Sequence, residues 1–134
     1  MTFGTTRTDW SLRIGRALFA APFVSGAASA LKDPGPLPGF AHKAGVPHPE
    51  LATKVAAAAM VAGALAIGTG VAPVAGGVVL AASLIGTTVI VHDFWSPQEE
   101  PVAAAHRKSF IANCGLLGGV IVVSGLGRTR YRVR

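Results

Sequence analysis

VAPVAGGVVLAASLIGTTVIVHDFW, residues 71–95, is a long apolar segment that ends abruptly at the tetrad HDFW. No charged residue occurs between residues 71 and 91, and a helix of that length can cross the roughly 30 Å hydrocarbon core of a bilayer. An ionisable pair followed by an aromatic pair is typical of a helix end in the headgroup layer, where Trp is enriched and charges are hydrated. The stretch therefore predicts a membrane-spanning helix over about residues 72–92, with its last residues as a candidate site.

The composition is too apolar for a soluble domain of this size. Of 134 residues, 51% are hydrophobic and only 13% are charged, whereas an ordinary soluble domain carries about 25% charged residues. The single cysteine, Cys114, lies in an apolar segment, so the chain can form neither an intramolecular disulfide nor a cysteine-based metal motif. The composition therefore indicates a small integral membrane protein.

Three further apolar segments have the length and composition of membrane spans, at about residues 12–31, 53–70 and 110–126. We therefore predict one all-α membrane domain over residues 1–134, a four-helix bundle with both termini on the same side. Residues 33–50 are rich in proline and glycine, which predicts a loop without regular helix. Residues 98–108 are expected to form a polar linker.

The first span also matches a secretory signal. Basic residues precede its apolar part, and Ala28-Ser29-Ala30 resembles a cleavage site. The apolar run nevertheless continues without a break to Leu31, which favours a retained span. A cleaved signal stays as the alternative.

Small residues at helical spacing predict where helices pack closely. Ala58, Ala62 and Ala66 recur at intervals of four in the second span, and Gly115 and Gly119 have GxxxG spacing in the fourth. Within lipid, helix association removes no apolar surface from water, so the hydrophobic effect does not drive it. Close contact between helix backbones at small residues is therefore the expected source of packing energy.

The charges predict how the bundle is oriented. Seven of the 12 Lys and Arg residues fall on the side of the termini, three around the start of the first span and four in the tail GRTRYRVR. Only one of the 6 Asp and Glu residues is on that side, so it carries the whole net charge of +6. The asymmetry favours cytoplasmic termini and a tail that binds anionic lipid headgroups, and it needs no nucleic-acid partner.

All four histidines fall on the face opposite the termini. His42 and His48 lie in the proline-rich loop, His106 in the polar linker and His92 at the end of a span. No two of them have the i, i+4 spacing of a helical metal motif. We therefore expect no metal site and solvated or structural histidines in the loops.

His92 and Asp93 are the candidate catalytic residues, because ionisable groups at the edge of a span are costly unless they are solvated or paired. Lys32, at the end of the first span, and Asn113, one turn inside the fourth, are expected at a similar depth. Asn113 either joins two helices through a hydrogen bond or contacts a ligand. Together the four residues suit the polar head of a quinone-like molecule whose tail lies in the apolar bundle.

Trp95 and Arg16 complete the candidates for cofactor binding. The simplest role for Trp95 is in an interfacial aromatic belt. Arg16 lies one turn after Arg13, and its simplest role is an anchor that reaches the headgroups. Both residues therefore keep a structural alternative beside the functional one.

Several motifs together resemble the DoxX family of small four-helix membrane proteins. They are HDFW at 92–95, FIANCGLLGG at 110–119, and a pattern in the first span of Arg16, Phe19, Phe23 and Gly26 leading to Leu31-Lys32. The resemblance extends over about residues 12–126. Ala112 departs from it, because relatives commonly have lysine before the asparagine.

The resemblance implies a subunit or accessory of a redox complex in a bacterial plasma membrane, with the lipid bilayer and other membrane or membrane-associated redox proteins as partners. DoxX-like proteins are associated with quinol oxidase and thiosulfate:quinone oxidoreductase assemblies, and with a complex of a superoxide dismutase and a sulfurtransferase. The sequence contains no established cofactor motif, so the cofactor stays unassigned, with a quinone as the candidate.

Two other functions stay open. One is a stand-alone oxidoreductase that passes electrons from a thiol or sulfur substrate to quinone. With a single cysteine in mid-span, such an enzyme would depend on His92 and Asp93 for proton handling. The other is a structural or transport-like membrane protein without a redox role. Whether the chain is itself an enzyme therefore stays open.

Overall fold

The computed structural model describes residues 5–125, and every regular element in that range is a helix. The elements are α1 (Thr5–Lys32), α2 (Leu37–Lys43), α3 (Pro49–Thr69), α4 (Pro73–Val91) and α5 (Glu100–Ser124). All except the short α2 are long and apolar enough to cross a membrane. The prediction of an all-α membrane bundle with four spans is confirmed. The expected headgroup-binding tail, residues 127–134, lies outside the described residues.

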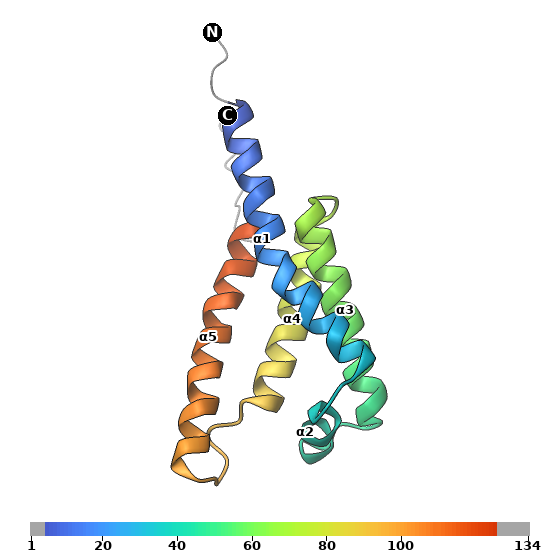
Figure 1. Ribbon diagram of the computed structural model, residues 1–134, viewed down its shortest axis with the longest axis vertical. Coiled ribbons are helices and arrows are strands. Elements are labelled where there is room, and N and C mark those ends of the chain that lie inside the picture. Colours follow the sequence, from blue (N-terminus) through green and yellow to red (C-terminus); the bar gives the residue numbers. More distant parts are fainter. Residues whose placement is uncertain (1–4, 126–134) are drawn as a thin grey trace, which may run out of the picture.

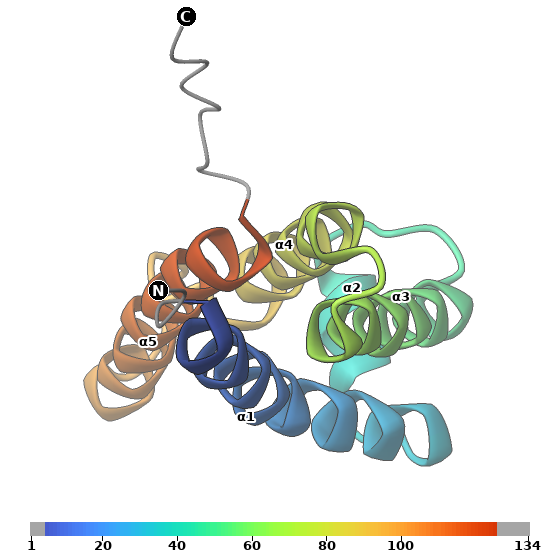
Figure 2. The ribbon, with the colours of Figure 1, turned by 90° about the horizontal axis from the view of Figure 1, so that it is seen from above.

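The four long helices lie close together at one end of the bundle and spread apart at the other (Figures 1 and 2). Extensive contacts join α1 to α3 and α3 to α4, whereas α1 and α5 touch much less. The terminal end comprises the first half of α1, the α3–α4 turn and the last turns of α5. The loop end comprises α2 and the α4–α5 connection, residues 92–99. Between these two parts of the loop end, the helices leave room for a cavity.

Helices α3 and α4 meet at backbone distance through two glycines. A Cβ atom at Gly76 would lie 2.6 Å from the carbonyl oxygen of Gly63, and one at Gly63 would lie 2.8 Å from the carbonyl oxygen of Gly76. Both distances are too short for any side chain. Of the predicted packing face of Ala58, Ala62 and Ala66, Ala66 does lie against Gly76, whereas the prediction is wrong for Ala58 and Ala62, because both are exposed. A stretch so rich in small residues offers several such faces, and the glycine on the partner helix decides which one packs.

The core lies between the long helices toward the terminal end. Ile67, Leu80 and Val120 are fully buried there. The ring of Phe19 closes the α1–α5 contact against Gly119, where a Cβ atom would lie 2.6 Å from Cε2 of that ring. A Cβ atom at Gly115 would meet nothing within 4 Å, so only half of the predicted GxxxG pair packs within the bundle.

The two polar connections are more helical than predicted. Residues 33–50 contain α2, and α5 begins at Glu100, so most of the expected linker at residues 98–108 is helix. The reason is the position of the prolines, which stand in the first turn of each of the helices α2, α3, α4 and α5. In the first turn a missing N–H costs nothing, because that N–H has no partner within the helix. Proline therefore starts these helices instead of breaking them.

Candidate functional site

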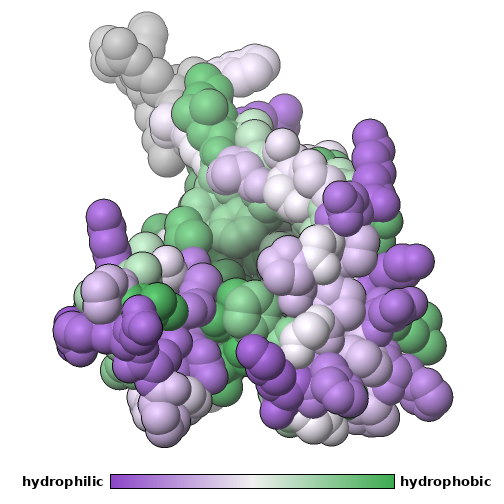
Figure 3. Space-filling view, turned by 60° about the horizontal axis from the view of Figure 1, so that its bottom comes forward, coloured by the Kyte–Doolittle hydropathy of each residue, from purple (hydrophilic) through white to green (hydrophobic). Residues whose placement is uncertain are grey.

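A half-open cavity of about 360 Å³ lies at the loop end, bordered by α1, α2, α3 and α4. Seen from that end, it is a hydrophobic hollow between polar groups (Figure 3). Small residues such as Gly26 on α1, Ala56 on α3 and Gly86 on α4 leave the space open. Leu37 and Ala41 of α2 line it as well. The unpredicted helix α2 is therefore part of the wall.

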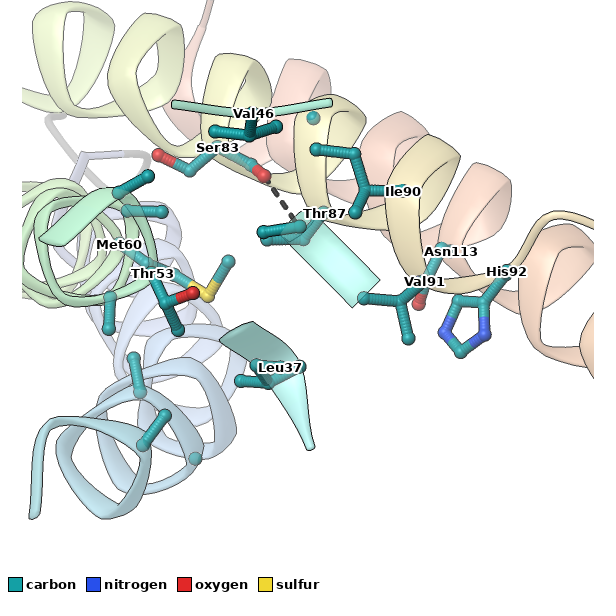
Figure 4. Close-up of a pocket in the computed structure, with 18 residues that line it drawn as sticks. Leu37, Val46, Thr53, Met60, Ser83, Thr87, Ile90, Val91, His92 and Asn113 are labelled. Atoms are coloured by element: carbon teal, nitrogen blue, oxygen red, sulfur yellow. Dashed lines mark hydrogen bonds between the residues drawn. The ribbon is translucent and has the colours of Figure 1, made fainter. Parts of the chain in front are cut away.

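Few polar side chains line this cavity. The hydroxyl groups of Thr53 and Thr87 donate to backbone carbonyl oxygens of their own helices, at 2.8 Å to Pro49 and 2.9 Å to Ser83. His92 and Asn113 lie together at one edge, beside Val91 (Figure 4). The cavity therefore has an apolar body and one edge that can form hydrogen bonds.

His92 reaches this edge because it ends α4. Its backbone N–H donates to the carbonyl oxygen of Thr88 at 2.9 Å, which closes the last turn of the helix. Its Nδ1 lies 3.4 Å from Nδ1 of His106 on α5. Burial, and next the charge of His106, lower the pKa of the His92 imidazole from its ordinary value of 6.5. His92 therefore favours the neutral form, in which one ring nitrogen donates and the other accepts.

The two imidazoles face each other head-on. Their ring centroids are 5.7 Å apart and their Nδ1 atoms 3.4 Å apart, so the difference is 2.3 Å. That difference is about twice the radius of an imidazole ring, which places both nitrogens on the line between the centroids. Two histidines that share one metal ion instead point their nitrogens at a third point beside that line. Within residues 5–125, no group of three or more His, Cys, Asp or Glu side chains is arranged to hold a metal ion.

Asn113 connects α5 to α4 at the same edge. Its Nδ2 donates to the hydroxyl oxygen of Thr88 at 3.0 Å, and Thr88 is only 6% exposed. Asn113 also lines a smaller cavity of about 130 Å³ between α4 and α5. The amide therefore joins two helices and also lines the main cavity.

Three other predicted residues lie at the loop end but do not line the cavity. Lys32 is exposed at the end of α1. Asp93 follows His92, and its backbone carbonyl oxygen accepts from Nε2 of Gln98 at 3.2 Å. Trp95 packs edge-to-face on Phe94, at 5.1 Å between ring centroids, and on Phe110 of α5. This aromatic cluster fixes the α4–α5 connection.

Arg16 lies at the terminal end, away from the cavity. Its Nε donates to the backbone carbonyl oxygen of Val123 at 2.9 Å.

Of the predicted site residues, the structure brings His92 and Asn113 together at the cavity edge, and it adds His106. His106 was missed because it was assigned to a linker. If Glu100-Pro101 is read as a helix start, positions 106 and 113 are seven residues, or two turns, apart on one face of α5.

The match to a family model covers more than half of the chain. The DoxX model matches residues 11–93. The chain belongs to the DoxX family. The matched part includes the four helices that supply most of the cavity lining and ends just after His92, whereas His106 and Asn113 on α5 lie beyond it. No curated protein and no solved structure matches the chain significantly.

Proposed function

We propose that this DoxX protein binds a quinone-class molecule in the loop-end cavity, as a subunit or accessory of a redox complex in the membrane. The observation that carries the proposal is an apolar cavity of about 360 Å³ with His92 and Asn113 at one edge. Binding sites for small molecules are mostly apolar, with a few polar groups that fix orientation. A quinone ring would place its oxygen atoms at this edge, and its tail would extend along the apolar walls.

The cysteine content supports a role beside partner proteins. A chain that cycles between a dithiol and a disulfide needs two cysteines of its own, and this chain has one. Cys114 is exposed on α5 and does not line the main cavity. If the complex handles thiols or sulfur compounds, the sulfur chemistry would therefore belong to a partner and the quinone to this chain.

The proposed location is a bacterial plasma membrane, and the charge asymmetry along the sequence supports an orientation in which both termini face the cytoplasm. Seven Lys and Arg residues lie on the terminal side and five on the loop side, and the excess on the cytoplasmic side is what sets orientation in most membrane proteins. A fluorescent protein fused after Arg134 should fold and fluoresce, and alkaline phosphatase fused there should be inactive. The opposite pair of results would reverse the orientation.

The binding part of the proposal can be tested with two matched glycine variants. Gly86 lines the cavity, and a Cβ atom there would meet nothing within 4 Å, so Gly86→Leu places a side chain at the cavity wall without a clash at its Cβ atom. Gly118 on α5 has the same open space but lies outside the cavity, so Gly118→Leu is the control. Binding of decylubiquinone to protein in nanodiscs would be measured by calorimetry, with decanol as a probe for the tail alone.

We expect Gly86→Leu to weaken binding of decylubiquinone about tenfold or more, a change of about 1.4 kcal/mol, and Gly118→Leu to leave it unchanged. Equal weakening by both variants, or no binding by the unaltered protein, would refute a quinone site in this cavity.

The proposed membership of a redox complex needs a separate test. Gentle purification of the chain from native membrane should yield redox proteins together with quinone. Recovery of the chain without either would count against a redox role.

A further inference from the structure

The partner of His92 is unusual for a histidine that contacts a ligand. The second ring nitrogen of such a histidine is commonly held by a carboxylate or a backbone carbonyl group. Those partners only accept hydrogen bonds, so they fix the proton on the nitrogen that faces them. The ligand then always meets the lone pair of the other nitrogen. Here the partner is a second imidazole, His106, which can donate or accept at Nδ1.

The geometry leaves the other nitrogen of His92 for the cavity. Nδ1 points head-on at His106, and Nε2 lies across the ring from that contact. His92 lines the cavity, whereas His106 does not. In Figure 4 the ring of His92 stands at the edge of the cavity beside Val91 and Asn113. Nε2 is therefore the atom of His92 that can meet a ligand.

Two arrangements of the pair satisfy the Nδ1 contact equally well. If His92 donates from Nδ1, its Nε2 carries a lone pair that accepts from a hydroxyl group. If His106 donates instead, the Nε2 of His92 carries the proton and donates to a carbonyl oxygen. Asn113 is compatible with both, because its bond to Thr88 uses one N–H and leaves a second N–H and the amide oxygen.

We infer that His106 is a positioning residue that lets His92 offer either a donor or an acceptor, so that the cavity takes both the oxidised and the reduced form of one quinone couple. This inference rests on the proposed function. A quinone presents carbonyl oxygens and a quinol presents hydroxyl groups, and the site binds each without leaving the Nδ1 contact unpaired. A fixed acceptor in place of His106 would make the site favour the quinol.

The test compares the affinities for decylubiquinone and decylubiquinol, measured anaerobically in nanodiscs at a pH above 8. The unaltered protein should bind the two forms with similar affinity. His106→Gln keeps a side chain that can donate or accept, and it should preserve this ratio. His106→Glu offers an acceptor only, so it should shift the ratio about tenfold toward the quinol, the effect of one hydrogen bond lost with the quinone.

A spectroscopic measurement separates this role from simple packing. In protein with ¹⁵N-labelled histidine, the shifts of Nδ1 and Nε2 of His92 should exchange between the quinone and quinol complexes, and His106→Glu should hold them in one state. If both forms bind but His106→Glu leaves their ratio unchanged, the role of His106 is refuted and the quinone site stands. Binding of only one form to the unaltered protein has the same consequence. Binding of neither form refutes both proposals.

Discussion

The Nε atom of Arg16 donates a hydrogen bond to the backbone carbonyl oxygen of Val123 over 2.9 Å, which ties α1 to the last turn of α5. Carbonyl groups in the last turn of a helix have no partner within the helix and carry partial negative charge, so a cation suits them. The same guanidinium group lies beside the α3–α4 turn, with Nη1 3.2 Å from the point where a Cβ atom of Gly70 would be. One side chain thus joins three parts of the terminal end.

Arg16→Leu should therefore destabilise the bundle. The variant loses a hydrogen bond from a charged group, which costs about 1.5–3 kcal/mol, and it leaves the carbonyl group of Val123 unpaired. Arg13→Leu is the matched control, because Arg13 is exposed and its contact is with the ring of Trp10 at 5.8 Å. Thermal unfolding in detergent should show a lower Tm for Arg16→Leu than for Arg13→Leu. Equal losses would mean that the link to α5 adds no stability.

The contact between Gly63 and Gly76 predicts a second stability effect. In Gly76→Ala the new methyl group would lie 2.6 Å from the carbonyl oxygen of Gly63 and 2.7 Å from Cβ of Ala66, so α3 and α4 would have to separate. We expect a cost of about 1–3 kcal/mol, typical of overpacking. Gly86→Ala on the same helix meets open space and should be close to neutral. Thermal unfolding of both variants checks this, and a neutral Gly76→Ala would show that the helices part easily.

The spans could be predicted from the sequence because they depend on composition over long segments. The segment at residues 71–91 is uncharged throughout, and α4 occupies Pro73–Val91. The residues at which helices begin could not be predicted as well, since a proline such as Pro101 can either end one helix or stand in the first turn of the next. The packing face of α3 depends on where Gly76 lies on α4, and no pattern within α3 contains that information.

Asn113 and Thr88 provide a direct measure of the polar contact between α4 and α5. Their hydrogen bond of 3.0 Å lies in an apolar part of the bundle, where such bonds average about 0.6 kcal/mol and reach about 1.7 kcal/mol. A double-mutant cycle with Asn113→Ala and Thr88→Val should give a coupling energy in that range. A coupling energy near zero would show that this hydrogen bond does not help to join the helices.

The candidate site was partly predictable for a related reason. His92 was found because it interrupts an apolar run, and Asn113 because it is an amide within one; both signals are local. Lys32 and Asp93 have the same local signal, yet neither lines the cavity. Which residues meet depends on how far α1 and α5 diverge at the loop end, and that divergence arises from packing at the opposite end.

The lowered pKa of His92, just beyond the end of α4, predicts how stability depends on pH. The unfolded chain protonates His92 as the pH falls below the ordinary value of about 6.5, while the folded protein keeps the imidazole neutral to a lower pH. Within that window the unfolded state binds more protons, so the free energy of unfolding decreases as the pH falls. Above the window, His92 is neutral in both states and makes no such contribution.

We expect the Tm of the unaltered protein to fall between pH 7.5 and pH 5.5, and the Tm of His92→Gln to fall less. His106→Gln should keep most of the pH dependence, because burial is the larger cause of the shift and the charge of His106 the smaller. His42→Gln is the control, since His42 is exposed on α2 and should leave the profile unchanged. Parallel profiles for His92→Gln and the unaltered protein would show that another group is responsible. A profile abolished by His106→Gln alone would show that the charge of His106, and not burial, keeps His92 neutral.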